Sequence, residues 1–258
     1  MKPKVVLAIA GFDPSTGAGI TADLKTIHAH EMYGVAAITA YTVQNTRGVQ
    51  LVEALDSLLL RQTVAALASD FVIDAVKVGM LASAEVVETV AALCEEYVLP
   101  NIVLDPVLLS SSGTTLLSAN ALEAFKEHLL PLATVVTPNV EEALTLTGAI
   151  EAEGAGDRLL ALGAKCIVIT EGEAAEPTDV LILPGMLPEL LGGEHVETTS
   201  THGTGCAFST SIACGLAAGQ SIRETVLSAK AYVNGALRHA PGLGKGRGPL
   251  AHFWKQKH

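Results

Sequence analysis

The sequence contains no apolar run that could cross a membrane. A transmembrane helix needs about 20 consecutive apolar residues, and no uncharged apolar stretch of this chain approaches that length. The first apolar run, residues 5–10, is short and meets a glycine loop instead of a cleavage site. It is therefore predicted to be a strand and not a signal peptide. We expect no membrane partner and a cytoplasmic location.

Paired cysteines and clustered basic residues are also lacking. Cys94, Cys166, Cys206 and Cys214 form no CxxC pair, and the histidines form no HExxH motif. A zinc ribbon and a thioredoxin-type redox pair are therefore not indicated, and reduced thiols fit the cytosol. The formal charge is -11, and Lys and Arg are scattered along the chain. Nucleic acid is excluded as a partner on this ground.

Aromatic residues make up only 4% of the chain, whereas hydrophobic residues make up 49%. The core must therefore be built from Ala, Val, Leu and Ile, which suits helices layered on a buried sheet. Short apolar runs alternate with stretches of helical spacing such as residues 84–97; the runs are residues 5–10, 36–42, 75–78, 102–104, 135–137 and 166–170. This alternation predicts an α/β fold with a central, mostly parallel sheet covered on both faces. We expect residues 1–258 to form one domain.

Polar and glycine-rich segments follow several predicted strands. They are residues 11–19, 44–46, 105–106 and 138–139. Ligands of open α/β sheets bind at the carboxyl ends of the strands, so these segments are the expected site. The loosest part of the chain, residues 171–193, is punctuated by Pro and Gly and is predicted to be a surface hairpin or a lid.

The strongest local signal is the Gly203-Thr204-Gly205 turn, which precedes an Ala-rich helical stretch over residues 207–218. Glycines let a ligand approach the backbone, and the start of a helix presents free N–H groups and a positive dipole end. The turn is then an anion hole. The alternative is an ordinary strand-to-helix turn whose glycines serve packing.

Cys206 follows this turn in the first turn of the predicted helix. The helix dipole lowers the pKa of a thiol at this position and favours the thiolate. This makes Cys206 a candidate general base or nucleophile. The alternative is an inert small residue, which is the interpretation we adopt for Cys94, Cys166 and Cys214 because they lie in apolar patterns.

Asn139 and Glu142 lie three residues apart at the start of another predicted helix. On one face of the first turn they could bind hydrated Mg²⁺ beside triphosphate oxygens. The same spacing is typical of an N-cap residue and its capping-box partner. Asp105, at a strand end, either adds a carboxylate to that metal site or caps a turn.

Three further residues are candidates for contact with a ligand in the binding site. Asp23, four residues beyond Gly19, could face the glycine loop and bind a ring amine, or it is an ordinary acid near a helix start. Lys245, in the glycine run of residues 242–248, could meet phosphate, or that run is a flexible tail. His202 is the histidine that merits a test. Neither the P-loop pattern nor G-x-G-x-x-G occurs in residues 11–19.

The motifs occur in an order that resembles the hydroxymethylpyrimidine/phosphomethylpyrimidine kinases. They span nearly the whole chain and comprise residues 10–13, 17–26, 43–49, 77–81, 103–107, 137–139 and 201–206. The resemblance implies a ribokinase-like three-layer α/β/α fold. It also implies ATP-dependent phosphorylation of 4-amino-5-hydroxymethyl-2-methylpyrimidine and then of its monophosphate, with Mg²⁺, in a homodimer that serves thiamine diphosphate synthesis.

The same resemblance assigns roles to individual residues. Asp105 and Glu142 would lie near the metal and the phosphates, residues 203–205 would form the anion hole, and Cys206 would be the base, where most ribokinase relatives carry an aspartate. The pyrimidine pocket would be lined by Gly11, Asp23, Gln44, Met80 and Val107.

The chain departs from the family pattern in three places. Ser110, Ser111, Ser112 and Gly113 stand where many members have Ala-Lys-Ser-Gly, and residues 170–173 stand where Lys-Gly-Gly-His is frequent. The first loop carries Phe12, Ser15, Thr16 and Thr21 in place of Ser, Gly, Gly and Gln. The altered loop keeps a pyridoxine or pyridoxal kinase as an alternative, and the missing lysines keep a degenerate kinase that acts as a ligand sensor.

Overall fold

The computed structural model describes residues 2–110, 113–171 and 177–256, and it contains a nine-stranded sheet. The strand order is β3-β2-β1-β4-β5-β6-β7-β8-β9. The strands are β1 (Val5–Phe12), β2 (Tyr33–Asn45), β3 (Gly48–Ala54), β4 (Ala75–Val78), β5 (Ile102–Leu104), β6 (Val135–Val136), β7 (Ile167–Ile169), β8 (Thr178–Ile182) and β9 (Glu189–Gly192). All pairs from β2 through β7 are parallel, and β3, β8 and β9 are added antiparallel at the edges.

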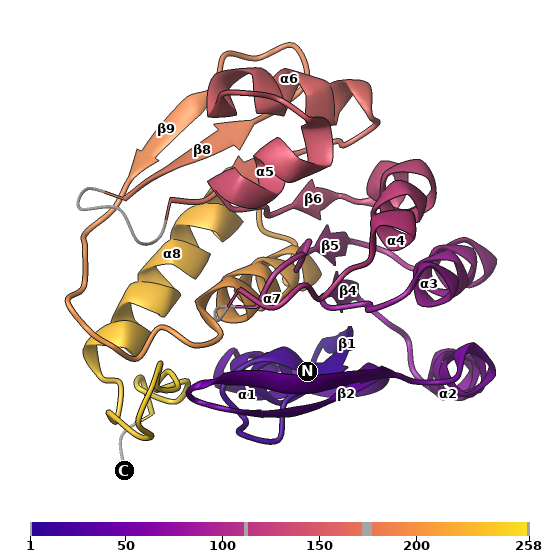
Figure 1. Cartoon of the computed structure of the whole chain (residues 1–258), viewed down its shortest axis with the longest axis horizontal. Helices are drawn as coiled ribbons and strands as arrows, with labels where there is room; N and C mark the ends of the chain where they lie inside the picture. Colours follow the sequence, from indigo (N-terminus) through magenta and orange to yellow (C-terminus); the bar gives the residue numbers. More distant parts are fainter. Residues whose placement is uncertain (1, 111–112, 172–176, 257–258) are drawn as a thin grey trace.

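Helices cover both faces of the sheet, so the expected three-layer α/β/α arrangement is confirmed (Figure 1). On one face lie α2 (Ser57–Asp70), α3 (Ala84–Glu96), α4 (Ala119–Ala124), α5 (Val140–Thr147) and α6 (Ala152–Ala161), with the short helical turns Phe125–Leu129 and Leu130–Leu132. On the other face lie α1 (Gly19–Ala29), α7 (Thr204–Ala217) and α8 (Ile222–Arg238).

The side chains of β1 show how one strand serves both layers. Leu7 and Ile9 belong to the core beneath α2 to α6, whereas Val6 and Ala8 belong to the core beneath α1, α7 and α8. All of them are fully buried. Successive side chains of a strand point to opposite faces, so a strand covered on both faces must be apolar throughout. This is why the central strands are visible in the sequence as unbroken apolar runs.

The edge strand β3 was not expected, because it lacks this pattern. β3 mixes polar and apolar residues and is mostly exposed, and it pairs with an extended β2 that begins before the predicted run and ends at Asn45. β8 and β9 form a hairpin, which confirms the hairpin interpretation of that segment. Residues 111–112 and 172–176, which carry parts of the expected lid and of two family departures, lie outside the described residues. Within the described residues, no helix is long and apolar enough to span a membrane.

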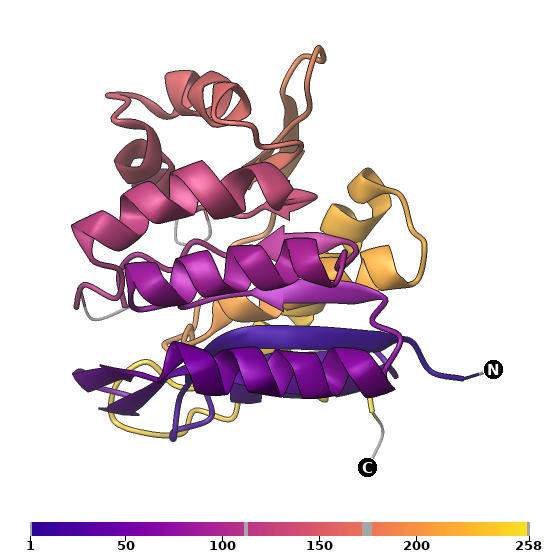
Figure 2. The ribbon, with the colours of Figure 1, turned by 90° about the vertical axis from the view of Figure 1, so that its right-hand side faces the viewer.

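The strand order creates a crevice at one end of the sheet. From β1 the chain first adds β2 on one side and later β4 on the other. Such a switch point separates the loops that follow neighbouring strands and leaves space for a ligand at their carboxyl ends. In Figure 2 the strands run from the side of the N-terminus toward the opposite side, where the β2–β3 hairpin projects.

Candidate active site

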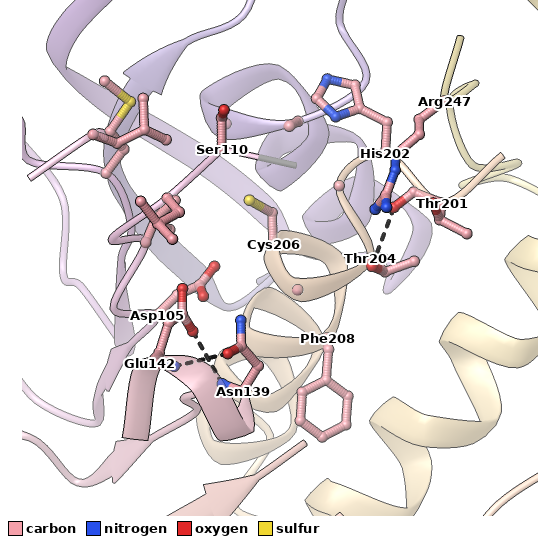
Figure 3. Close-up of a pocket in the computed structure, with 18 of the residues that line it drawn as sticks. Asp105, Ser110, Asn139, Glu142, Thr201, His202, Thr204, Cys206, Phe208 and Arg247 are labelled. Carbon is pink, nitrogen blue, oxygen red and sulfur yellow. Dashed lines mark hydrogen bonds between the residues drawn. The ribbon is translucent and has the colours of Figure 1, made fainter. Parts of the chain in front are cut away.

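A cavity of about 1820 Å³ opens at the carboxyl ends of the strands. The parallel strands β1, β2, β4, β5, β6 and β7 contribute to its wall through their last residues or the loops that follow, and the antiparallel β3 contributes its first residues. Figure 3 shows Cys206 in the middle of the wall, between His202 on one side and Asp105 and Glu142 on the other. The sequence-predicted residues that line the cavity are Gly11, Gln44, Met80, Asp105, Val107, Asn139, Glu142, His202, Gly203, Thr204, Gly205, Cys206 and Lys245.

The Gly-Thr-Gly turn forms the start of α7. Gly203 is the N-cap and adopts a left-handed conformation with φ of 84°, which favours glycine. No side chain of the described residues caps this helix. The Thr204 N–H donates to the Thr201 carbonyl (3.5 Å), so the N–H groups of Gly205 and Cys206 are the ones that could meet a ligand. Together with the positive end of the helix dipole, they make the turn suitable for a phosphate group. The anion hole itself remains a prediction.

The expected lowering of the Cys206 pKa is wrong. Burial raises the pKa of the Cys206 thiol to about 12, against a smaller lowering by Lys77. Asp105 and Asp23 also raise this pKa. The helix dipole alone is too weak to overcome the cost of placing a thiolate among buried atoms and carboxylates. Cys206 still lies at the cavity wall, and its thiol is the protonated form at neutral pH.

Asn139 and Glu142 form the capping box, and they also face the cavity. The Asn139 N–H donates to Glu142 Oε2 (3.0 Å), and the Glu142 N–H donates to Asn139 Oδ1 (2.9 Å). Burial, and next the nearby Asp105 carboxylate, raise the pKa of Glu142 to about 8. Two carboxylates that oppose each other's ionisation provide the oxygen ligands and the charge that attract a cation.

Asp23 does not line the cavity, so its predicted contact with substrate is corrected. Its side chain is fully buried and binds Lys77 Nζ (3.0 Å to Oδ1) and Thr210 Oγ1 (2.8 Å to Oδ1). Lys77 Nζ also lies 3.6 Å from Asp105 Oδ2, and Ser209 Oγ donates to that oxygen (3.2 Å). The carboxylate of Asp23 thus serves the buried lysine beneath the cavity and not a ligand within it.

Lys77 was missed by the sequence interpretation although it carries a signal. It is the one charged residue in β4, whose residues are all buried, and its own exposure is 0%. Burial alone would lower the pKa of Lys77, but Asp23, Cys206 and Asp105 together raise it, so the ammonium stays charged. Gly79 provides the space, since a Cβ there would lie 2.7 Å from Nζ. A lysine inside an otherwise apolar strand needs buried carboxylates, which could have been sought.

His202 and Lys245, two of the residues predicted for the binding site, lie at the same end of the cavity. His202 is buried, and its Nε2 lies 2.9 Å from Asp13 Oδ2. The Lys245 N–H donates to Thr46 Oγ1 (3.1 Å). The glycine run is therefore packed against the β2–β3 turn, and it is not a flexible tail.

The opposite end of the cavity has apolar walls that the sequence interpretation did not identify. Phe208 of α7 and Val233 and Leu237 of α8 line it together with Asn234 and Lys230. Lys230 Nζ is held by Asp179 Oδ2 (2.8 Å). Apolar surface beside a few polar groups suits a flat heteroaromatic ring.

Comparison with known proteins gives consistent matches over the whole chain. Residues 13–251 match the family model described as phosphomethylpyrimidine kinase. A hydroxymethylpyrimidine/phosphomethylpyrimidine kinase of Streptomyces coelicolor is 42% identical over 257 residues, covering 98% of this chain and 95% of that protein.

Solved structures of two pyridoxal kinases are also similar. The ADP complex of the Bacillus subtilis enzyme has a TM-score of 0.90 and 35% identity, and the match covers 97% of this chain and 98% of that chain. The Staphylococcus aureus enzyme in complex with AMP-PCP and pyridoxal has a TM-score of 0.88 and 31% identity, with 99% and 96% covered.

Replacing Lys77 by Met should destabilise the protein strongly. Removing one partner of a buried ion pair leaves charge uncompensated and costs about 3–5 kcal/mol of unfolding free energy. The measurement is equilibrium unfolding in guanidinium chloride. Arg61→Met, which breaks an exposed pair with Glu96 (2.8 Å), is the control and should cost less than about 1 kcal/mol. Equal losses in the two variants would refute the importance of the buried ammonium.

Proposed function

Since the chain belongs to the phosphomethylpyrimidine kinase family, we propose that it phosphorylates 4-amino-5-hydroxymethyl-2-methylpyrimidine with ATP, and then phosphorylates the monophosphate to the diphosphate for thiamine diphosphate synthesis. The fold is the expected ribokinase-like one. The observation that carries the proposal is one cavity that joins the turn of residues 203–205 at the start of α7, a thiol, two carboxylates and apolar surface. Phosphoryl transfer needs such positioning and charge neutralisation more than covalent chemistry.

The pyrimidine is proposed to bind where Gly11, Gln44, Met80 and Val107 meet. Gln44 Nε2 donates to Thr42 Oγ1 (2.8 Å), which fixes the rotation of the amide. Its Oε1 then suits the amino group of the ring, because an amide can donate and accept at once. Met80 is nearly buried and supplies an adaptable apolar contact.

The nucleotide is proposed to occupy the other end, with its base against Phe208, Val233 and Leu237. The cavity extends from this apolar region to the turn at Gly203. The ADP and AMP-PCP complexes of the similar pyridoxal kinases support nucleotide binding in this fold. The terminal phosphate would then lie on the N–H groups that open α7.

Asp105 and Glu142 fit a magnesium ion. Among the described residues no three His, Cys, Asp or Glu side chains gather as a complete metal site. Two carboxylates are enough for Mg²⁺, which is usually held by one or two carboxylates, water and substrate phosphates. Burial is the main cause of the raised pKa of Glu142, and repulsion from Asp105 raises this pKa further; a cation would relieve that repulsion. When bound, the ion supplies neutralisation of phosphate charge.

Cys206 is proposed as the general base. Its thiolate accepts the proton of the substrate hydroxyl while that oxygen bonds to the γ-phosphorus and the bond from this phosphorus to the bridging oxygen breaks. Because the pKa of the thiol is about 12, the thiolate is a minor species. The Lys77 ammonium and the start of α7 are the groups that favour it.

Two further proposals concern the state of the protein. A homodimer is supported by an exposed apolar face of the β2–β3 hairpin formed by Tyr41, Val43 and Leu51, whose exposed fractions are 48%, 44% and 54%. The hairpin projects beyond the neighbouring helix α2 (Figure 2). A second copy of the chain would cover this face. A cytoplasmic location is supported by free thiols at all described cysteines.

The proposed substrate is tested by pyrimidine-dependent ADP formation. We expect ATP consumption with 4-amino-5-hydroxymethyl-2-methylpyrimidine and a higher kcat/KM for it than for pyridoxine or pyridoxal under identical conditions. The pyridoxal kinases of similar structure make these compounds the relevant rivals. A preference for pyridoxal would overturn the assignment, and binding without turnover would leave a ligand sensor.

Cys206→Ala should lower kcat by about 10²–10⁴-fold, the usual contribution of a general base, with pyrimidine affinity nearly unchanged. Below a pKa of about 12 the thiolate fraction grows with pH, so kcat of the unmodified enzyme should rise between about pH 7 and pH 9. Steady-state kinetics with the Cys94→Ala variant as the thiol control measures both. An unchanged kcat in Cys206→Ala would remove the residue from this role.

Leu51→Glu should dissociate the proposed dimer. A carboxylate in an apolar contact must be desolvated without a partner, which is costly. Light scattering after size exclusion should give twice the chain mass for the unmodified protein and the chain mass for the variant. Leu187→Glu, which places the same carboxylate at an exposed leucine (91%) between β8 and β9, is the matched control. A monomeric unmodified protein would exclude this interface.

A further inference from the structure

Asp13 and His202 form a buried contact between two loops that the proposed mechanism does not use. Asp13 lies in the loop after β1, which borders the proposed pyrimidine end of the cavity. His202 immediately precedes the turn of residues 203–205, which is the proposed phosphate turn. The exposures are 1% and 8%, and Nε2 lies 2.9 Å from Oδ2. A carboxylate only accepts, so Nε2 carries the proton and donates it.

The Asp13 carboxylate is committed to the protein and not to a ligand. The N–H groups of Ser15 (2.7 Å), Gly17 (3.1 Å) and Ala18 (2.9 Å) donate to it. Burial by itself raises the pKa of Asp13, but the bonds from His202, Ser15 and Ala18 outweigh this and lower it. The ionised group therefore fixes the loop and the imidazole around one point, and such charge-assisted bonds are strong when water is excluded.

Glycines let the two loops touch directly. A Cβ on Gly17 would overlap the His202 ring, and a Cβ on Gly203 would overlap the Gly17 carbonyl and lie 3.2 Å from Ala18 Cα. The phosphate turn thus rests on the backbone of the loop after β1. A shift of the His202 ring therefore changes the position of one loop relative to the other.

The far side of His202 is fixed by the C-terminal segment. The His202 N–H donates to the Gly248 carbonyl (3.1 Å), and the Gly248 N–H donates to the Thr199 carbonyl (3.2 Å). Two residues earlier, Gly246 packs against Thr46 in the β2–β3 turn. The C-terminal segment holds the backbone of His202, so the contact of the imidazole with Asp13 determines where the loop after β1 lies relative to it.

We propose that His202 is a positioning residue that acts through Asp13 and holds the phosphate turn at Gly203 in register with the loop of residues 11–19. The inference rests on the proposed function, because the two loops then bear the donor phosphate and the acceptor alcohol. Without the contact, each substrate still binds its own loop, but the hydroxyl and the γ-phosphate are misaligned. Misplacement by about 1 Å is enough to cost about 10²-fold in rate.

The test compares His202→Ala, Asp13→Asn, their double variant and Gly17→Ala. We expect kcat to fall by about 10–100-fold in each, with the dissociation constants of AMP-PCP and of the pyrimidine within about threefold of the unmodified values. The double variant should be no worse than either single variant, because both remove one contact. His202→Gln, whose amide N–H can still donate, should recover part of the rate.

His128→Ala is the control, since His128 is exposed and lies outside the cavity. Additive losses in the double variant would overturn the proposal. The proposal would also be overturned if Asp13→Asn left kcat unchanged while His202→Ala weakened AMP-PCP binding. His202 would then contact the nucleotide itself.

A second measurement is independent of turnover and so separates this inference from the proposed function. Hydrogen exchange of the unliganded protein should become faster at the amides of Gly17 and Ala18 and at the first turn of α7, in both His202→Ala and Asp13→Asn. If only the loop that carries the substitution responds, the two loops are not coupled. If the loops respond together but no pyrimidine is phosphorylated, the contact stands and the substrate assignment fails.

Discussion

The buried ammonium of Lys77 is the interaction around which the site is assembled. It projects from β4 and binds Asp23 of α1 and Asp105, which follows β5, and those carboxylates are bonded in turn by Thr210 and Ser209 of α7. Four elements thus meet at one charge beneath the cavity. Because an unpaired charge is so costly in a core, only an arrangement that brings all of them together is stable. The start of α7, and with it Cys206, is positioned as a result.

Much of the fold could be predicted, because burial on both faces leaves an unbroken apolar signal. The runs that became β4 and β5 were predicted with the observed bounds, and α3 ends one residue before the predicted end. The edge strands of the sheet were harder to predict from the sequence. In β3, Gln50 and Glu53 interrupt the apolar residues, so no unbroken apolar run marks this strand. The short β6 was found because its two valines lie fully in the core.

The site was predictable to the extent that topology alone determines it. Residues after parallel strands must gather at one edge, so Gln44, Asp105 and Asn139 were found without knowledge of any contact. What failed depended on burial and pairing. Asp23 looked like a ligand contact because its lysine partner lies 54 positions away in the sequence, and the pKa of Cys206 was misjudged because the dipole of α7 is local whereas desolvation depends on the whole fold.

The contacts made by Gly17, Gly79 and Gly203 set a boundary for redesign. At each of them a single added methyl group would meet the backbone or a functional side chain. Small changes along this inner framework are therefore expected to disturb alignment before they alter which compound is accepted. Substrate scope should be adjustable instead at Met80 and Val107, whose flexible or modest side chains border the pocket and can be exchanged for others of similar volume.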